Sequence, residues 1–283
     1  MINEIRNKAK ELLEKKRVEC VIGYERATDG LTARPAFIYD PSEVDRLIFD
    51  ETCVHNLSRF LIDKKHKATA IVAKPCDSRG INLLLNESQL KRENLFIIGV
   101  VCSGVKKVRF NQIEDSLQNK CQYCPQHVPS VYDFLVGEPV TETASRNYAE
   151  VTAIEDMTSA DRKLFWAEHF DRCIRCYGCR QVCMGCYCYE CFVDELDPLW
   201  AGIRIASSEN RMWNTMRAFH LAGRCISCGE CERVCPVNIP LMLLNRKLEK
   251  DTVHLFDFEP GINAETTPPF ATFKKGEDLG ISK

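Results

Sequence analysis

The sequence lacks the features that mark membrane and nucleic-acid-binding proteins. Its longest apolar run, Leu95–Val101, is far too short to cross a bilayer. Its 38 basic and 40 acidic residues give a net charge of −2, so no positive excess favours nucleic acid or an anionic membrane. The N-terminus is charged throughout and carries Glu4, Glu11 and Glu14, so we expect neither a secretory signal nor a transit peptide. These observations predict a cytoplasmic protein without a membrane span.

Familiar catalytic motifs are missing as well. The sequence contains no glycine-rich phosphate loop of the GxGxxG or Walker type, and no Ser-His-Asp or paired-carboxylate constellation can be specified. Cysteine, in contrast, is abundant: 17 of 283 residues, most of them clustered. A disulfide scaffold would need a short, secreted chain, which this is not. The clusters therefore favour metal binding in a reducing compartment.

The N-terminal half has the pattern of an α/β domain. Residues 2–16 have the apolar spacing of an amphipathic helix. Two runs, 68–73 and 95–101, are apolar and rich in β-branched residues, as expected for buried parallel strands. The segment 78–90 between them has helical spacing, which completes a βαβ unit. We interpret residues 1–155 as an α/β domain with a parallel sheet.

The second half combines helices with cysteine clusters. The segments 161–170 and 209–221 have helical character and each leads into a cluster, whereas 240–249 leaves the second one. We interpret residues 156–252 as an α-helical, ferredoxin-like two-cluster domain. Residues 253–283, which contain several prolines and glycines, are expected to form an extended tail.

The strongest signal is a C-x2-C-x2-C-x3-C spacing that occurs twice. Three thiolates at two-residue gaps can surround one 4Fe–4S cubane, and the fourth cysteine reaches the neighbouring cluster. The spacing therefore predicts crossed ligation. Set one comprises Cys173, Cys176, Cys179 and Cys235, and set two comprises Cys225, Cys228, Cys231 and Cys183.

Two zinc sites are the structural alternative for the repeat, but zinc sites usually present paired C-x2-C knuckles rather than four-cysteine runs. The pattern therefore favours iron–sulfur. The first run departs from the usual form at Met184, because a proline is expected there, as Pro236 stands in the second run. Proline donates no ligand, so the departure leaves the crossed ligation intact.

Four further cysteines lie in the α/β domain. Cys76 and Cys102 each follow a predicted parallel strand, at the end where open α/β sheets place their ligands. Together with a later C-x2-C pair they form set three: Cys76, Cys102, Cys121 and Cys124. We predict a third 4Fe–4S site here. The alternative is two buried thiols beside a zinc knuckle.

The remaining cysteines allow several interpretations of their role. Cys20 is interpreted as a core residue. Cys186, Cys188 and Cys191 form a dense run with Cys183. They could bind a further metal, offer alternative ligands to the set-two cluster, or be thiols packed near it.

The α/β domain resembles a known family in three stretches, CVHNLSRFLIDKKHKATAIVAKPCD, FIIGVVCSG and KCQYCPQHVPSVYDFLVG, within residues 50–140. They are similar to beta subunits of deazaflavin-reducing hydrogenases and related formate dehydrogenases. The resemblance implies an α/β domain with iron–sulfur clusters and, in several members, a flavin such as FAD. It also implies Cys102, Cys121 and Cys124 as ligands, with Cys76 or Cys53 completing the set.

Two further comparisons with known families bear on cofactors. The sequence has Cys53-Val54-His55 where the beta subunits usually show Cys-Gly-Gly, and glycines there would allow close approach to a cofactor. This departure argues against an inherited flavin site. Residues 165–250 resemble the helical ferredoxin-like domains of iron–sulfur subunits in fumarate and heterodisulfide reductases.

These patterns predict an iron–sulfur electron-transfer subunit of an anaerobic multi-subunit oxidoreductase. The resemblances suggest a complex of the hydrogenase, formate dehydrogenase or heterodisulfide reductase type, with electrons relayed between a flavin or dehydrogenase subunit and an acceptor subunit. Two alternatives stay open: an FAD-containing catalytic beta subunit that acts on a deazaflavin or similar substrate, and an interaction module stapled by zinc.

Overall fold

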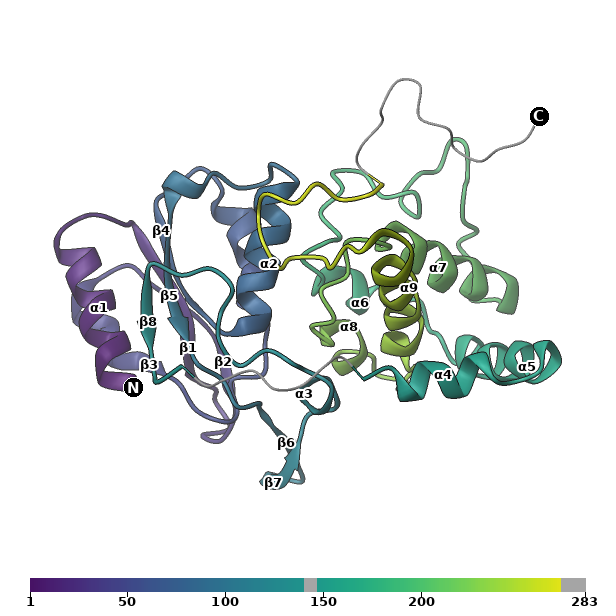
Figure 1. Cartoon of the computed structure of the whole chain (residues 1–283), viewed down its shortest axis with the longest axis horizontal. Coiled ribbons are helices and arrows are strands. Elements are labelled where there is room, and N and C mark those ends of the chain that lie inside the picture. The colour runs from purple at the N-terminus through teal and green to yellow at the C-terminus, as the bar shows by residue number, and fades with distance from the viewer. Residues whose placement is uncertain (140–146, 271–283) are drawn as a thin grey trace.

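The structure is a computed structural model that describes residues 1–139 and 147–270. Residues 271–283, the end of the expected tail, lie outside the described part. The N-terminal half is built on one mixed sheet with the strand order β2-β1-β4-β5-β8 (Figure 1). Strands β1, β4, β5 and β8 run parallel, whereas β2 and the short β3 pair antiparallel with β1. The strands are β1 (Cys20–Arg26), β2 (Ala33–Ile38), β3 (Leu47–Ile48), β4 (Thr69–Ala73), β5 (Leu95–Val100) and β8 (Phe134–Val136).

Helices cover both faces of this sheet because its central strands are apolar on both sides. In β4, Ala70 and Val72 pack in the same core as helix α1 (Ile2–Glu14). Ile71 and Ala73 pack on the opposite face with α2 (Pro75–Asn86) and a 3-10 helix, η2 (Leu57–Lys64). Alternation of side chains along a strand produces these two cores. Two shorter 3-10 helices are η1 (Pro41–Arg46) and η3 (Arg92–Asn94).

A hairpin and a short helix follow β5. Strands β6 (Lys106–Arg109) and β7 (Gln112–Leu117) pair antiparallel and project away from the main sheet (Figure 1). Helix α3 (Asn119–Gln122) comes next and carries Cys121. The sequence patterns did not predict this hairpin, because its strands are polar and only partly buried.

The C-terminal half is helical and lies beyond α2 (Figure 1). Helices α5 and α7 pack on each other, α6 contacts α8, and α4 packs on α9. Each cysteine run begins in a loop and continues through a one-turn helix, α6 or α8, which carries its third cysteine. The elements are α4 (Ala149–Glu155), α5 (Ser159–Asp171), α6 (Gly178–Gln181), α7 (Ser207–His220), α8 (Glu230–Arg233) and α9 (Leu241–Phe256).

The two halves share a packed core. Met184 and Ile226, which lie next to cysteines in the two runs, belong to the same apolar cluster as Leu83 of α2. Met184 is 2% exposed, so the residue that replaces the usual proline packs against the α/β half. Arg224 also pairs with Glu87 at the end of α2. The cysteine runs are therefore held directly against the sheet domain.

The segment after α9 returns to the α/β half. Helix α9 extends to Phe256, beyond the expected start of the tail. Residues 257–270 form no regular element, and the backbone carbonyls of Pro260 and Gly261 accept hydrogen bonds from Arg79 and Asn82 of α2. This stretch is the yellow chain beside α2 in Figure 1.

The predicted fold class is confirmed: a parallel-sheet α/β region is followed by a helical region with the paired cysteine runs. None of the helices in the described ranges is both long and apolar enough to span a membrane.

Candidate metal centres

The two cysteine runs fold alike. In each run the residues on both sides of the second cysteine have left-handed backbone conformations: Arg175 and Tyr177 around Cys176 (φ 51° and 56°), and Ser227 and Gly229 around Cys228 (φ 56° and 70°). Non-glycine residues adopt this region rarely. Both one-turn helices then end on a valine with φ −85° and ψ −9°. The repeat in the sequence is therefore a repeat in structure.

The structure brings together the cysteines that the spacing assigns to set one. Cys179 lies within electrostatic range of Cys173, Cys176 and Cys235. Cys173, Cys179 and Cys235 also share an apolar cluster with Trp213 of α7. Cys176 is the exposed member of the set.

The set-two cysteines line one small cavity. Cys183, from the first run, borders it together with Cys225, Cys228 and Cys231 of the second. The contact between α6 and α8 produces this exchange, because each fourth cysteine follows one of these helices and points back to the other run.

The local chemistry of set two fits an iron–sulfur cluster. Burial raises the pKa of Cys225 to about 12 and also raises the pKa values of Cys228 and Cys231. A buried thiolate is disfavoured unless positive charge compensates it, and bound iron provides that charge. Cys231 Sγ accepts a hydrogen bond from Asn245 Nδ2 at 3.6 Å. Hydrogen bonds to sulfur are common around protein-bound clusters.

Arg217 supplies a buried positive charge between sets one and two. It is 3% exposed on α7, and its Nη2 donates to the carbonyl of Cys179 at 2.9 Å. Its Nε, also buried, has no hydrogen-bond partner among the described residues. Burial opposes the positive charge of Arg217, but the nearby cysteine sulfurs, with Cys231 and Cys183 first among them, raise its pKa above the usual value. An unpaired buried cation is costly, and an anionic cluster would compensate it.

No group of three His, Cys, Asp or Glu side chains in the described parts of the chain converges as a single metal ion would require. A cubane has a different requirement, because its four thiolates bind four separate corners.

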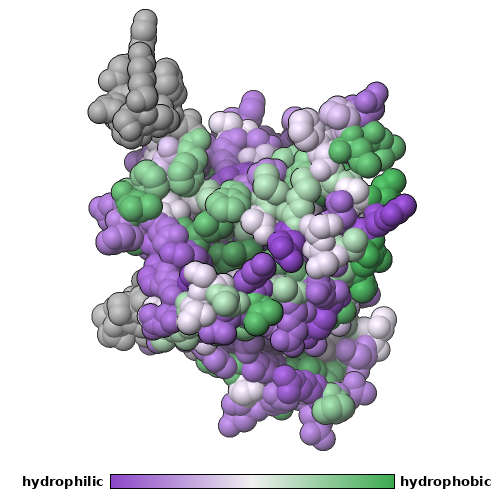
Figure 2. Space-filling view, turned by 90° about the vertical axis from the view of Figure 1, so that its right-hand side faces the viewer, coloured by the Kyte–Doolittle hydropathy of each residue, from purple (hydrophilic) through white to green (hydrophobic). Residues whose placement is uncertain are grey.

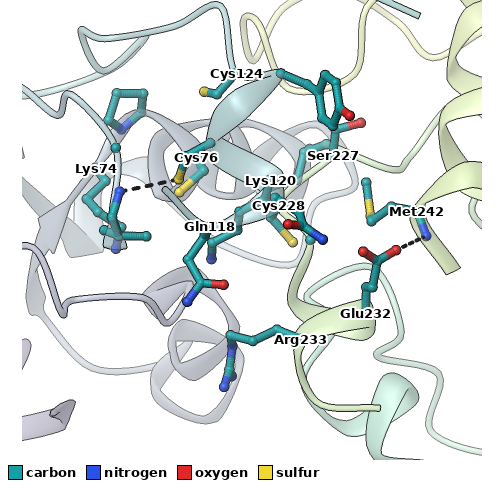
Figure 3. A pocket seen from close by; sticks show the side chains of 18 of the residues that line it. Lys74, Cys76, Gln118, Lys120, Cys124, Ser227, Cys228, Glu232, Arg233 and Met242 are labelled. Atoms are coloured by element: carbon teal, nitrogen blue, oxygen red, sulfur yellow. Dashed lines mark hydrogen bonds between the residues drawn. The ribbon is translucent and has the colours of Figure 1, made fainter. Parts of the chain in front are cut away.

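Set three lines a much larger cavity of about 830 Å³ between the two halves (Figure 3). Cys76 lies in the first turn of α2, directly after β4, and Cys102 follows β5. Cys121 and Cys124 reach the same cavity from α3 and the residues after it. Cys228 of set two also lines this cavity, so sets two and three share a wall.

Backbone donors and burial characterise set three. The N–H of Gly104 donates to Cys102 Sγ, and the N–H of Val105 donates to Cys121 Sγ, each at 3.4 Å. Burial raises the pKa values of Cys76 and Cys102. The burial matches that of set two, and hydrogen bonds to sulfur together with burial fit the same kind of ligand.

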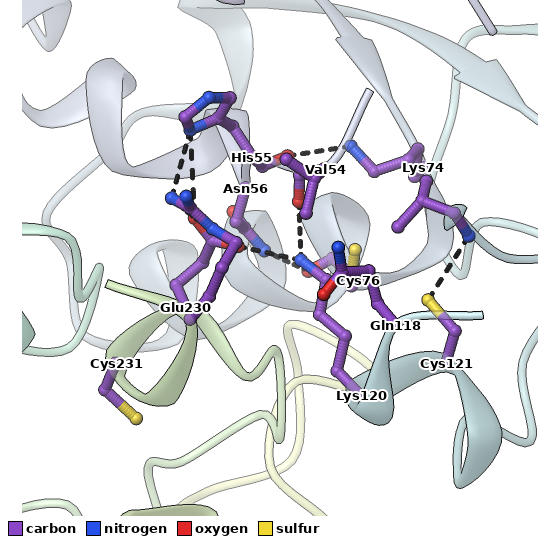
Figure 4. Close-up of polar contacts among 12 residues, drawn as sticks. Val54, His55, Asn56, Lys74, Cys76, Gln118, Lys120, Cys121, Glu230 and Cys231 are labelled. Atoms are coloured by element: carbon purple, nitrogen blue, oxygen red, sulfur yellow. Dashed lines mark hydrogen bonds and ion pairs between the residues drawn. The ribbon is translucent and has the colours of Figure 1, made fainter. Parts of the chain in front are cut away.

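Two buried lysines lie beside set three (Figure 4). Lys74 Nζ lies 2.9 Å from Asp77 Oδ2 and also donates to the Tyr24 hydroxyl. Burial opposes its charge, but Asp77 and Tyr24 outweigh that effect and hold the pKa of Lys74 well above its usual value. Lys120 pairs with Glu230 at 2.7 Å and donates to the carbonyl of Val54. Burial raises the pKa of the Cys76 thiol, and both lysine charges oppose this by favouring its thiolate form.

Cys53 lies apart from set three. It is fully buried, does not line the large cavity, and its sulfur accepts a hydrogen bond from the N–H of Asp50 at 3.4 Å. Burial raises its pKa to about 12. Of the two residues proposed to complete set three, Cys76 is the one at the site.

The other cysteines occupy different surroundings. Cys20 is a core residue of the sheet. A hydrogen bond from the Cys186 thiol lowers the pKa of Cys183 below its usual value. Cys188 is exposed, and Cys191 packs in the apolar cluster that contains Cys173, Cys179 and Cys235.

Sequence reasoning missed four polar residues at these sites. Lys74 and Lys120 are close in sequence to Cys76 and Cys121, and this proximity was the only available signal. Arg217 and Asn245 are distant in sequence from the cysteines they approach and gave no signal.

Comparisons with known proteins agree with this geometry. Residues 172–240 match the 4Fe-4S dicluster domain family. The F420-dependent formate dehydrogenase subunit beta of Methanocaldococcus jannaschii is 23% identical over 353 aligned positions, which cover 92% of both chains. The F420-dependent formate dehydrogenase 1 subunit beta of Methanococcus maripaludis is 22% identical and covers 92% of this chain and 90% of its own. The resemblance to formate dehydrogenase beta subunits is confirmed, and the chain contains a 4Fe–4S dicluster domain.

Proposed function

We propose that this chain is an electron-transfer subunit of a multi-subunit oxidoreductase of the formate dehydrogenase type, in which twelve cysteines hold three 4Fe–4S clusters. Sets one and two would hold the two clusters of the dicluster domain, and set three would hold a cluster in the α/β half. Bound clusters of this kind accept and pass on single electrons. The relatives are beta subunits of formate dehydrogenases, which supports a role within a complex.

The observation that carries this proposal is the order of the ligand sets. Cys228 lines both the set-two cavity and the set-three cavity. Arg217 lines the set-two cavity and hydrogen-bonds the backbone of Cys179 in set one. The sets therefore form a continuous series, three-two-one, from the carboxyl edge of the sheet into the helical half. A relay requires such an uninterrupted series.

The set-one end of this series reaches the surface. Cys176 is exposed, and so are the neighbouring Ile174 and the residues Trp200 and Ile203 of the loop before α7. Arg175 holds this loop against the first run through the carbonyl of Gly202. Figure 2 faces the end of the molecule that carries α5 and α7, and hydrophobic side chains reach its surface there. An apolar surface beside an exposed ligand is typical of a contact with a partner subunit.

Counting iron and acid-labile sulfide in anaerobically purified protein tests the proposal. We expect about twelve of each per chain, at four per cubane. About eight would remove the cluster of set three and leave the dicluster domain. Zinc with little iron would overturn the proposal in favour of an interaction module stapled by zinc.

A second function is favoured by the size of the set-three cavity. Its volume of about 830 Å³ lies in the range of cofactor sites, and Lys107, Arg109 and Arg233 are among its lining residues. These cations would suit an anionic cofactor such as FAD, which would make the chain a catalytic beta subunit. Flavin absorbance near one equivalent per chain would favour this function, whereas iron–sulfur absorbance alone would favour the relay.

A further inference from the structure

Two polar side chains from helices outside the cysteine runs border the set-two cavity. Arg217, on α7, and Asn245, on α9, line the small cavity that the four set-two cysteines border. Arg217 is 3% exposed and Asn245 is 2% exposed. Water therefore does not compete for their N–H groups.

These two side chains have few hydrogen-bond partners among the described residues. Asn245 Nδ2 donates to Cys231 Sγ at 3.6 Å. Arg217 Nη2 donates to the carbonyl of Cys179, but the buried Nε has no partner among the described residues. A buried guanidinium N–H without an acceptor is costly. A sulfur atom held in the adjoining cavity would satisfy it.

Set one has a different environment. Among the described residues, a backbone hydrogen bond reaches its sulfurs, from the N–H of Ile239 to Cys235 at 3.4 Å, and no side-chain amide or guanidinium N–H donates to them. One of its thiols, Cys176, is also exposed to solvent. The side-chain donors are therefore concentrated on set two.

Hydrogen bonds to sulfur and nearby positive charge both favour the reduced state of a cluster, because that state carries one more negative charge. We infer that Arg217 and Asn245 raise the reduction potential of the set-two cluster above that of the set-one cluster. An electron shared between these two clusters then rests preferentially at set two. This inference depends on the proposed function, because it requires clusters at both sets.

Redox titration of the anaerobic full-length protein, followed by EPR, tests the inference. Ser replacements of Cys179 and Cys225 would assign each EPR signal to its set. We expect the set-two signal to have the higher midpoint potential in the unaltered protein. Asn245→Leu removes a donor at similar volume, and Arg217→Lys keeps the charge but removes Nε. Each should shift the electron equilibrium between the two clusters at least about threefold toward set one, where a tenfold shift equals 59 mV.

Arg217→Met removes both charge and donors, so it should lower both potentials and affect set two more. Arg211→Met is the matched control, because Arg211 is exposed on the same helix, and it should change neither potential. If Arg217→Met loses iron, the Lys and Leu variants still decide the question.

Unchanged potentials in the Lys and Leu variants, or a higher potential at set one in the unaltered protein, would overturn the inference while leaving the proposed function intact. Unaltered protein that lacks iron would instead overturn the proposed function, and the iron count made before titration separates the two cases.

Discussion

Lys120 Nζ lies 2.7 Å from Glu230 Oε1, and their side chains are only 8% and 3% exposed. Lys120 directly precedes Cys121 of set three, whereas Glu230 lies between Cys228 and Cys231 of set two (Figure 4). The ion pair thus connects the two halves of the molecule at the point where sets two and three meet. Burial opposes the charge of Glu230, but Lys120 and Arg233 lower its pKa to about 2.

Replacing Lys120 by Met should destabilise the protein because it leaves the buried Glu230 carboxylate with only the Arg233 guanidinium still paired to it at 2.7 Å. Removing one member of a buried pair typically costs about 3–5 kcal/mol, and the remaining Arg233 pair should keep the cost at or below the lower end of that range. Anaerobic urea unfolding followed by tryptophan fluorescence measures the change. Lys15→Met is the control, because its pair with Glu11 is exposed and solvent screens such pairs, so that they contribute little to stability. Equal, small effects of both substitutions would show that the Lys120 pair does not hold the halves together.

Crossed ligation predicts which single substitutions have the same effect. Cys179→Ser and Cys235→Ser should weaken or remove one EPR signal, although they lie in different runs. Cys183→Ser and Cys225→Ser should affect the other signal. EPR of the four dithionite-reduced variants makes the comparison. If Cys179→Ser and Cys183→Ser affect the same signal, each run holds its own cluster and the crossing is wrong.

Substitutions in the α/β half separate the two residues that could complete set three. Cys76→Ala should lower the iron content by about four atoms per chain, from about twelve to about eight, because Cys76 lines the cavity. Cys53→Ala should leave it unchanged, because Cys53 is a buried thiol away from the cavity. Iron analysis of both variants, beside the unaltered protein, decides between them. Loss of about four irons in the Cys53 variant would show that Cys53 is a ligand.

The fold class and the grouping of the cysteines could be predicted because both depend on local patterns. Apolar runs such as 68–73 form central parallel strands, since a strand buried on both faces needs no alternation. The repeated spacing fixes which thiols can share a cubane, and the structure places those thiols together. Cys76 and Cys102 meet at one cavity because parallel strands end at the same edge.

The missed features depend on contacts between distant parts of the chain. The hairpin β6–β7 is polar, so no hydrophobic period revealed it. Met184 stands where the motif usually has a proline, and the reason is visible only in the structure: it packs into the core shared by the two halves. Arg217 and Asn245 reach set two only after α7 and α9 have packed around it. None of these contacts has a signature within one segment.

His55 should make the stability of the protein depend on pH. Burial and the positive charge of Arg233 lower its pKa from 6.5 to about 4, although Glu230 opposes the shift. The folded chain therefore keeps His55 neutral between these values, whereas the unfolded chain binds a proton below about pH 6.5. Because the unfolded state then binds more protons, stability falls as the pH drops from 6.5 toward 4.

The slope expected from this one group is at most about 1.4 kcal/mol per pH unit, and less here because the His55 side chain is 29% exposed. Urea unfolding at pH 7.5 and 5.5 should show a larger loss for the unaltered protein than for His55→Gln, in which no proton can bind. Taking the difference between the two proteins cancels the contributions of other groups. Parallel losses would mean that His55 titrates alike in the folded and unfolded chains and that its burial against Arg233 has no energetic consequence.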